Sequence, residues 1–576
     1  MHEFINLINI SSNLIDMSLE TEIEKHALAN AIKHKGKANP AAVIGPLIGK
    51  DPALKHKIKK LMKLISKGVA KINKLSPREQ FAMLQKLAPD MLEEKPKKEK
   101  KPELKELKGA ERGKVVTRSA PNPNGAIHLG NARAAVLSFM YAQKYKGKFI
   151  LRFDDTSPKT KPPLLQAYDW VQEDLKWLGA KIDSVHYASK NFERYYEIAE
   201  KLINIGKAYV CTCDPEEWRE KKEKGIACPC RNKPVKEHMR RWKAMFTDYK
   251  EGDAVLRIKT DLKHKDPSRR DFWAAKVIDN PNHPITGNKH RVWPSYNLQS
   301  AIDDHDLGTT HIMRGQEHTQ NELRQKYIYK YLGWEYPIAI HHGRVILKTG
   351  GLSTSKTSEL IKSGEYSGWD DVRLITIRAL RRRGFQAAAI RDIEVDIGLN
   401  TNDSIIDSAK LAAFNRRYID PIANRYMFVH DPVKVKIKNA PELKAVLANH
   451  PDFPGKGKRE ILTTGTFYIT KQDYDKLESG GFYRLMDCLN FIKSNKEFVF
   501  EGTDMDVYRK KGKGILHWVK SGLPIKVLMP DGKHIKGLGE LALKELRIGE
   551  IVQFIRFGFC RLEKKGEILQ FVFTHD

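Results

Sequence analysis

The chain has 576 residues, with 102 lysines and arginines against 71 aspartates and glutamates, and so a formal net charge of +31 at pH 7. Because a single hydrophobic core stops growing near roughly 250 to 300 residues, this length excludes one domain and predicts three to five. No run reaches the roughly 18 apolar residues that a membrane span needs, and six cysteines in so long a chain exclude a disulfide scaffold.

The excess of positive charge predicts a polyanionic partner, with nucleic acid as the first candidate. A host cell of unusual ionic composition is the alternative. The first residues, "MHEFINLINISSNLIDM", contain no basic n-region and make a poor secretion signal, so we expect a cytoplasmic protein. Met17 is a second candidate start, which would make residues 1–16 a leader.

The N-terminal part of the chain is expected to be helical. Residues 1–92 include "HKIKKLMKLISKGVAKI", in which apolar residues recur at helical spacing. Residues 93–110, "EEKPKKEKKPELKELKGA", are almost entirely charge and proline and cannot bury a core. We therefore expect a helical extension joined to the rest by a charged linker.

A parallel α/β domain is predicted next, in two halves. The order "KVVTR", a glycine-rich turn, a helical run and "KFILRF" is that of a βαβ unit in residues 111–205. A second such region, residues 291–349, runs from "VWPSYNLQSAIDD" through "THIMRG" to "PIAIHH". Residues 206–290 then form an insertion that splits the domain.

The glycine-rich turn "SAPNPNGAIHLGN" has two glycines, Gly125 and Gly130, at the spacing of a phosphate-binding loop. Asn131 stands where that loop has its lysine. The glycines permit close approach of a ligand to the backbone, and the N-terminus of the following helix attracts phosphate. Ordinary packing and turn chemistry is the alternative.

Four cysteines cluster in the insertion with the spacing C-x-C-x14-C-x-C: Cys211, Cys213, Cys228 and Cys230. Four thiolates suit tetrahedral zinc in a closed structural site. The alternative is four free thiols, since the C-x-C spacing is tighter than usual.

The last two segments differ in pattern. Residues 350–420 become helical again after the stretch "GGLSTSKTS". Residues 421–576 consist of short alternating or β-branched runs separated by turn residues, which is typical of a β-barrel or β-sandwich.

Several of these motifs together resemble one enzyme family. "PNGAIHLGN" resembles the HIGH motif of class I aminoacyl-tRNA synthetases, and "GGLSTSKTS" resembles its KMSKS partner on a mobile loop. "LRFDDT", "WPSYNLQSAIDD", "HIMRGQEH" and "GWDDVRLITIRALRRRGF" resemble the glutamyl and glutaminyl branch, in the right order. With "KGKANPAAVIG" and the all-β C-terminus, the chain is identified as a member of the archaeal-type glutamyl-tRNA synthetases.

The resemblance implies a multidomain α/β fold. Its parts are a Rossmann-like parallel-sheet catalytic domain with an inserted acceptor-binding domain, a helical subdomain and a C-terminal β-barrel anticodon-binding region. The implied reaction is ATP-dependent ligation of L-glutamate to tRNA(Glu) through a glutamyl-adenylate, with Mg²⁺ bound to ATP and tRNA required for activation. We expect a monomer with no membrane partner. Charging of tRNA(Gln) is left open.

The resemblance also implies site residues. His128 and Lys356 would be catalytic, and the ATP-binding set would be Pro121, Asn122, Gly125, His128, Gly130, Asn131, Ser355 and Lys356. The glutamate-binding set would be Arg118, Asp154, Tyr296, Ser300 and Arg314. Thr354 stands where most relatives carry the second lysine of KMSKS, so Lys348 is an alternative phosphate contact to Lys356.

Two of these residues bear on the choice of amino acid. Arg118 and Arg314 end predicted strands, where open α/β sheets place ligands, and a guanidinium offers a planar fork to a carboxylate. Glutaminyl enzymes lack an arginine at the position of Arg314, which favours glutamate. A glutaminyl-tRNA synthetase and a non-catalytic tRNA-binding protein of the same fold remain the alternatives, and a surface ion pair is the alternative for either arginine.

Overall fold

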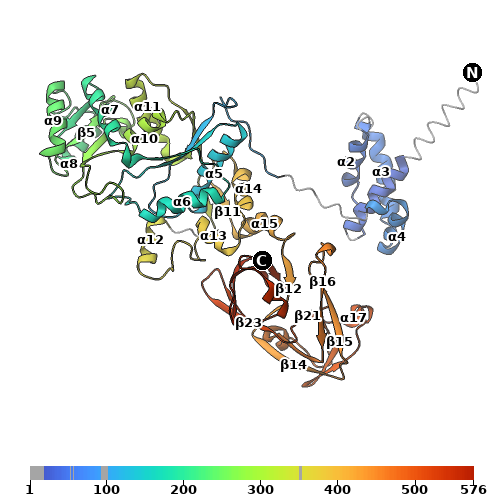
Figure 1. The fold of residues 1–576 in the computed structure, drawn as a ribbon. Helices are drawn as coiled ribbons and strands as arrows, with labels where there is room; N and C mark the ends of the chain where they lie inside the picture. Colours follow the sequence, from blue (N-terminus) through green and yellow to red (C-terminus); the bar gives the residue numbers. More distant parts are fainter. Residues whose placement is uncertain (1–18, 35, 52–53, 56–57, 92–100, 349–352) are drawn as a thin grey trace, which may run out of the picture. The chain divides into compact units, whose positions relative to one another are not determined.

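The computed structural model describes residues 19–34, 36–51, 54–55, 58–91, 101–348 and 353–576. The chain divides into two compact units, Met1–Lys100 and Lys101–Asp576 (Figure 1). No helix in the described ranges is both long and apolar enough to cross a membrane.

The first unit is a small helical bundle. A helix over residues 19–33 is followed by α2 (Pro40–Lys50), α3 (Ile58–Ile72), α4 (Pro77–Leu87) and η2 (Pro89–Met91). Ser76 caps α4 in a reciprocal capping box with Glu79. A Cβ on Gly68 would lie 2.7 Å from Cγ2 of Ile23, so a glycine here lets α3 pack closely on the first helix.

The second unit begins with a parallel five-stranded sheet in the order β3-β2-β1-β8-β9. Its strands are β1 (Val116–Ser119), β2 (Lys148–Phe153), β3 (Ser184–Tyr187), β8 (His311–Gly315) and β9 (Ile338–His342). The accompanying helices are α5 (Leu129–Lys144), α6 (Leu165–Trp177), α7 (Phe192–Asn204), α10 (Tyr296–Asp306) and α11 (Thr319–Leu332), with short turns η3 (Ala188–Lys190) and η5 (Gln316–His318). Residues nearly 200 positions apart therefore lie on adjacent strands, β1 and β8.

An antiparallel sheet interrupts the parallel one. It has the order β4-β5-β6-β7, and its elements are β4 (Ala208–Cys211), α8 (Pro215–Glu223), α9 (Val235–Thr247), β5 (Val255–Ile258), η4 (Pro267–Arg269), β6 (Phe272–Val277) and β7 (Val292–Pro294). The sheet thus extends to Pro294, because β7 pairs with β6 before the chain returns to α10.

A helical region follows the parallel sheet. It comprises β10 (Val345–Leu347), α12 (Thr354–Lys362), α13 (Ile377–Arg383), α14 (Ala387–Ile397), β11 (Ser404–Ile406) and α15 (Ser408–Ile419). Strands β10 and β11 form a two-stranded parallel sheet. α14 and α5 contribute to one hydrophobic core, which includes Ile390, Ile393, Val136 and Phe139.

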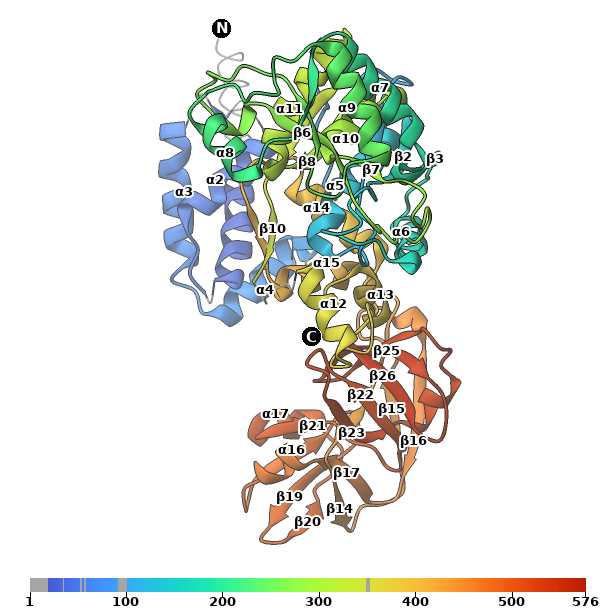
Figure 2. The same cartoon turned by 90° about the vertical axis from the view of Figure 1, so that its left-hand side faces the viewer.

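The C-terminal part is almost all β (Figure 2). A seven-stranded sheet has the order β12-β24-β25-β26-β22-β23-β13, and a six-stranded sheet the order β17-β14-β20-β19-β18-β21, while β15 and β16 pair separately. The strands are β12 (Asn424–Tyr426), β13 (Phe428–His430), β14 (Pro432–Lys438), β15 (Leu443–Ala448), β16 (Lys458–Thr463), β17 (Thr466–Thr470), β18 (Phe482–Leu485), β19 (Asn490–Ser494), β20 (Glu497–Phe500), β21 (Gly514–Leu516), β22 (Leu523–Leu528), β23 (His534–Gly539), β24 (Ile551–Phe554), β25 (Gly558–Lys564) and β26 (Leu569–His575), with η6 (Pro454–Lys456), α16 (Lys471–Asp475), α17 (Met505–Lys511) and η7 (Leu541–Glu545) between them. Arg383 of α13 donates to the carbonyl of Thr574, which joins this part to the helical region.

Candidate active site

His128 lies at the junction between the glycine-rich turn and α5. It is the N-cap of that helix, and its Nδ1 accepts a hydrogen bond from the backbone N–H of Asn131 at 3.3 Å. Burial lowers the pKa of His128, so the ring is neutral near pH 7. Because Nδ1 accepts, the proton resides on Nε2, which makes His128 a neutral hydrogen-bond donor.

The two glycines of the turn are required by close neighbours. A Cβ on Gly125 would lie 2.4 Å from the Trp369 ring and 2.9 Å from Cγ2 of Thr354. A Cβ on Gly130 would lie 3.4 Å from the carbonyl oxygen of Val345. The start of α12 and strand β10 therefore both contact the turn, and this brings the HIGH-like and KMSKS-like segments together.

The N-terminus of α5 has fewer free donors than the sequence suggests. The N–H of Leu129 donates to the carbonyl of Ile375, and the N–H of Asn131 donates to His128. Within the described ranges, Gly130 is left as the one residue among the first three of the helix whose N–H has no acceptor. A phosphate would meet one backbone donor and the Nε2–H of His128 here.

Lys356 lies on a helix, which corrects the expectation of a loop. Ser353 caps α12 by accepting from the backbone N–H of Lys356 at 3.2 Å, so the helix begins at Thr354 and includes Ser355. The remainder of the predicted loop, residues 350–352, lies outside the described residues. The Lys356 ammonium is half exposed and pairs with Glu359 at 3.1 Å. Such an exposed pair is weak, so the ammonium can be drawn to a phosphate.

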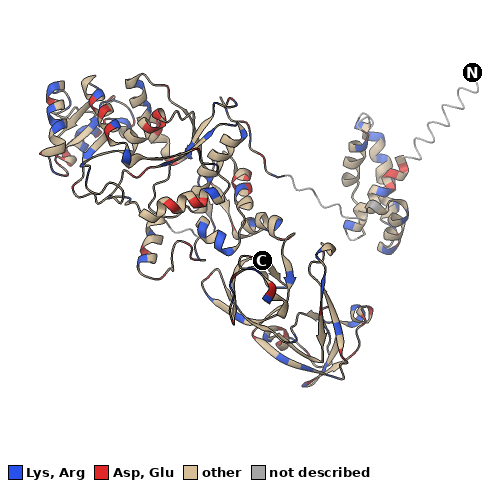
Figure 3. Ribbon diagram, in the orientation of Figure 1, with Lys and Arg blue, Asp and Glu red and all other residues tan. Residues whose placement is uncertain are grey.

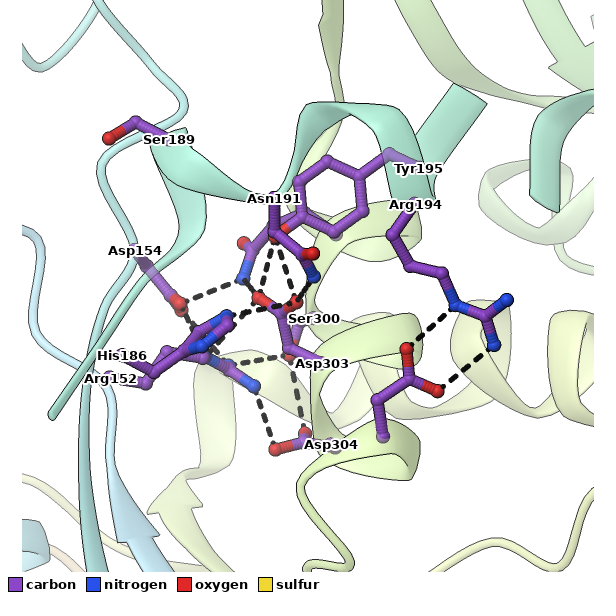
Figure 4. A network of polar contacts seen from close by, with 12 residues as sticks. Arg152, Asp154, His186, Ser189, Asn191, Arg194, Tyr195, Ser300, Asp303 and Asp304 are labelled. Atoms are coloured by element: carbon purple, nitrogen blue, oxygen red, sulfur yellow. Dashed lines mark hydrogen bonds and ion pairs between the residues drawn. The ribbon is translucent and has the colours of Figure 1, made fainter. Parts of the chain in front are cut away.

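Arg152 is the centre of a buried polar network beside the carboxyl ends of β1 and β2 (Figure 4). Its Nε donates to Asp154 at 2.7 Å, its Nη1 to Asp304 at 2.8 Å and its Nη2 to Ser300 at 3.0 Å. Gln299 donates to the same Asp154 carboxylate at 3.0 Å. Two of the predicted glutamate-binding residues, Asp154 and Ser300, are thus held in place by one arginine.

Asp303 forms the second centre of this network. Its carboxylate accepts from the Tyr195 hydroxyl at 2.8 Å, from Gln299 at 2.6 Å and from Asn191 at 3.1 Å. Asp303 therefore joins α10 to α7 and to the residue that precedes α7, Asn191.

Arg118 is 3% exposed and makes a two-point ion pair with Asp304, through Nε at 2.9 Å and Nη2 at 3.3 Å. Burial alone would raise the pKa of Asp304, but the guanidiniums of Arg118 and Arg152 outweigh it and lower that pKa to about 2. Asp304 is therefore ionised at any working pH. In the described part of the chain nothing accepts from Nη1 of Arg118, which leaves that nitrogen for a ligand.

Arg314, at the end of β8, is also buried but has different partners. Its Nη1 donates to Gln325 at 3.0 Å and its Nη2 to the Tyr336 hydroxyl at 2.9 Å. Since each terminal nitrogen of a guanidinium carries two N–H groups, one on each remains for a ligand. Glu322 lies 3.8 Å from the same guanidinium.

His318 lies beside the predicted glutamate-binding residue Tyr296 and was not found from the sequence. Burial, followed by the charges of Arg314 and Arg118, lowers the pKa of His318 to about 4. Its ring lies 5.4 Å from that of Tyr296, at the start of α10. Arg118, Arg314, His318 and Tyr296 thus belong to one neighbourhood. The sequence signal for His318 was its place in "GQEH", at the end of β8. The signal for Arg152 was an arginine within an apolar strand, two residues before "DD".

The residues before the glycines connect the turn to β2. The carbonyl of Pro121 accepts from the N–H of Asp154 at 3.0 Å, and Nδ2 of Asn122 donates to the carbonyl of Asp154 at 2.9 Å. Oδ1 of Asn122 is buried without a partner. A buried acceptor in this position is suited to an N–H or O–H donor of a bound substrate.

The four cysteines lie together at the edge of the antiparallel sheet. The Sγ atoms of Cys211 and Cys228 are 3.9 Å apart, and those of Cys213 and Cys230 are 3.7 Å apart. Zn–S bonds of about 2.3 Å in a tetrahedron place neighbouring sulfurs about 3.8 Å apart, so the donor set fits zinc. Cys211, Cys213 and Cys228 are mutually within 4.8 Å.

The C-terminal aromatic residues are less available than their sequence suggests. Phe554 of β24 and Phe559 of β25 are fully buried. Arg556 forms an ion pair with Asp473 at 2.8 Å. Exposed basic side chains are instead found on α17, at Arg509 and Lys510.

The comparisons with known proteins cover both the catalytic and the C-terminal regions. The family "tRNA synthetases class I (E and Q), catalytic domain" matches residues 114–421, and its "anti-codon binding domain" models match residues 423–506 and 515–563. A glutamate–tRNA ligase of Pyrococcus abyssi is 50% identical over 571 residues, covering 97% of this chain and 100% of the relative.

Two further relatives agree. Glutamate–tRNA ligases of Thermococcus kodakarensis and Methanothermobacter thermautotrophicus are 50% and 42% identical, and the alignments cover 96% and 97% of this chain and 98% and 99% of the relatives. The chain therefore belongs to the class I glutamate–tRNA ligases.

Proposed function

We propose that this chain attaches L-glutamate to tRNA(Glu) in two steps, at the carboxyl edge of the parallel sheet. The glutamate α-carboxylate attacks the α-phosphate of ATP and displaces pyrophosphate. A terminal hydroxyl of the tRNA then attacks the carbonyl carbon of the glutamyl-adenylate, forms the ester and releases AMP. The observation that carries this proposal is the pair of buried arginines, Arg118 and Arg314, which retain unused N–H groups beside His318.

The arginines explain the choice of glutamate. A side-chain carboxylate would accept from Nη1 of Arg118 and from the free N–H groups of Arg314, and both guanidiniums are fixed by protein partners before substrate arrives. Asp154 and Tyr296 would receive the α-amine, and Ser300 would line the pocket. Glutamine, which carries no charge to pair with these arginines, would bind less well, so a glutaminyl enzyme is disfavoured.

The glycine-rich turn would receive ATP. Nε2–H of His128 and the N–H of Gly130 would donate to the phosphates, and Lys356 would neutralise charge on the departing pyrophosphate. Asn122 supplies a buried acceptor, and Pro121, Gly125, Asn131 and Ser355 complete the lining. Mg²⁺ would arrive bound to ATP and neutralise further phosphate charge. Catalysis is then mainly positioning and charge stabilisation.

Zinc would have a structural role. Cys211, Cys213, Cys228 and Cys230 would hold it and tie the segment containing α8 to the end of β4. Since four protein ligands leave no open position, zinc would take no part in the reaction.

Aminoacylation of purified tRNA(Glu) and tRNA(Gln), each supplied separately with labelled glutamate and ATP, tests the proposal. We expect labelled tRNA(Glu), and labelling of tRNA(Gln) would show that both are substrates. A chain that binds tRNA but labels neither, with no tRNA-dependent ATP–pyrophosphate exchange, would be the non-catalytic alternative.

A further inference from the structure

The first unit carries a strongly basic surface on α3. Four lysines of this helix are exposed, and we call them the lysine face: Lys59, Lys60, Lys63 and Lys67. At 3.6 residues per turn they fall within an arc of about 100°. The buried residues of the helix, Leu61, Ile65, Val69 and Ile72, lie on the opposite side. The helix is thus held by its apolar side and presents its charge to solvent.

The lysine face has no ion-pair partner among the described residues. Residues 52–78 contain nine lysines and arginines and no aspartate or glutamate. Two carboxylates of the first helix pair with other lysines, Glu22 with Lys25 and Lys50, and Glu24 with Lys71. None of the four lysines makes an ion pair with any described residue. Figure 3 marks the lysines and arginines of the chain in blue and the aspartates and glutamates in red.

A helix face that bears only positive charge is destabilised by repulsion when it is exposed to water alone. Lys59, Lys63 and Lys67 are spaced four residues apart, so they repel one another along the helix. Solvated helix faces usually mix both signs of charge. A polyanion bound along the face would remove this repulsion and release its own counterions.

The packing of α3 favours RNA over a membrane as the partner of the lysine face. A basic helix binds a lipid surface by inserting its apolar side, and in α3 that side is buried in the bundle. We propose that the lysine face binds the phosphate backbone of the tRNA substrate, as a contact additional to the regions matched by the synthetase family, which begin at residue 114. This inference rests on the proposed function, because that function supplies the RNA.

The test uses the full chain with Lys59, Lys63 and Lys67 changed to glutamine. We expect the Kd for tRNA to rise about tenfold at 0.1 M salt, and the slope of log K against log salt to fall in magnitude by about 2. The KM for tRNA should rise with it, while kcat at saturating tRNA stays unchanged. A separate variant with Lys59, Lys63 and Lys67 changed to arginine keeps the charge, and its Kd for tRNA should be close to that of the parent chain.

A matched control removes the same charge from the same unit. Lys33, Lys37 and Lys86 are exposed and lie outside α3, and their change to glutamine should leave the Kd close to that of the parent chain. An unchanged Kd and salt slope in the α3 variant would overturn the proposal, as would an equal loss in the control. Loss of binding to anionic phospholipid vesicles with unchanged tRNA affinity would overturn it in favour of a membrane.

Failure of the proposed function would look different. A parent chain that binds tRNA but does not charge it would refute the ligase assignment, while the dependence of tRNA affinity on the lysine face would still support this inference.

Discussion

At the scale of single residues, the site depends on arginines whose orientation is set by carboxylates on α10. Asp304 contacts both Arg118 and Arg152, and so it joins the β1 guanidinium to the network around β2. We propose a positioning role for it, since it holds Nε and Nη2 of Arg118 and leaves Nη1 without an acceptor among the described residues. Removal of a partner from a buried charge pair is costly because the other charge is left unpaired.

We therefore expect Asp304→Asn to raise the KM for glutamate at least about tenfold, equivalent to about 1.4 kcal/mol, with little change in the KM for ATP. Steady-state aminoacylation with each substrate varied in turn measures this. Asp306→Asn is the matched control, because Asp306 is on the same helix but pairs with Arg194 at the surface. Equal effects of the two changes would contradict a positioning role for Asp304.

The burial of the Glu394 carboxyl predicts that the stability of the chain depends on pH. It is fully buried on α14, both its carboxylate oxygens lack partners, and burial raises its pKa from 4.5 to about 8. In the fold it stays protonated while the unfolded chain ionises above about pH 4.3. The contribution of Glu394 to the free energy of unfolding should thus be greatest below about pH 4.3 and fall as pH rises towards 8.

Glu394→Gln should flatten this slope and stabilise the chain at pH 8 by on the order of 2 to 4 kcal/mol, with a smaller gain at pH 5. Unfolding followed by calorimetry at the two pH values gives the comparison. Asp396→Asn, on the same helix but half exposed and paired with Lys410, should show no such dependence. A gain independent of pH would refute the account.

At the scale of elements, α12 begins beside the glycine-rich turn and contains the candidate phosphate-binding lysine. A Cβ on Gly125 would lie 2.9 Å from Cγ2 of Thr354, the first residue of α12. Lys356 is two residues further along the same helix. The sequence showed a Gly/Ser/Thr-rich stretch, which is typical of a loop. It could not show that Ser353 would cap a helix there, because capping depends on the geometry that the following residues adopt.

Lys356→Ala is expected to slow adenylate formation about 10- to 100-fold with nearly intact tRNA affinity, because its charge acts on the departing pyrophosphate. The rate of ATP–pyrophosphate exchange measures this effect. Lys362, an exposed lysine in the last turn of the same helix, provides the control, and Lys362→Ala should leave that rate unchanged. Lys348→Ala should also be close to neutral. A large loss there and none at Lys356 would transfer the role to Lys348.

The cysteine cluster makes a prediction for the inserted sheet. Elemental analysis of the purified chain should return about one zinc, and Cys228→Ser should lose it and lower the thermal stability of the chain. Cys488→Ala, at a buried cysteine outside the cluster, should keep the metal. Absence of zinc from a normally folded chain would leave the four thiols free.

At the scale of the whole molecule, the succession of regions was predictable because each has its own pattern. Strand–turn–helix order marked the parallel sheet, and β-branched runs marked the C-terminal region. The expectation that residues 93–110 bury nothing was wrong for their described part, residues 101–110, because Leu107 packs in a hydrophobic core with Leu137, Tyr141 and Met313. The fold class and the enzyme family are confirmed by the match to the class I synthetases, whereas the individual site residues stay predictions.

The network beneath the site could not be predicted in the same way. "LRFDD" and "AIDD" are about 150 residues apart, and neither indicates that an arginine on β2 pairs with carboxylates on α10. That contact exists because the antiparallel sheet is inserted between them and the chain returns to the same edge. Long-range pairing of this kind depends on topology, which local patterns do not contain.

Competition between glutamate and glutamine for attachment to purified tRNA(Glu) tests the central claim most directly. With both amino acids present, the ratio of their kcat/KM values reports how much the buried guanidiniums of Arg118 and Arg314 favour a charged side chain. The account predicts a preference for glutamate of at least about 10³-fold, which should largely disappear in Arg314→Gln. Equal use of the two amino acids by the parent chain, or a preference unchanged in the variant, would contradict it.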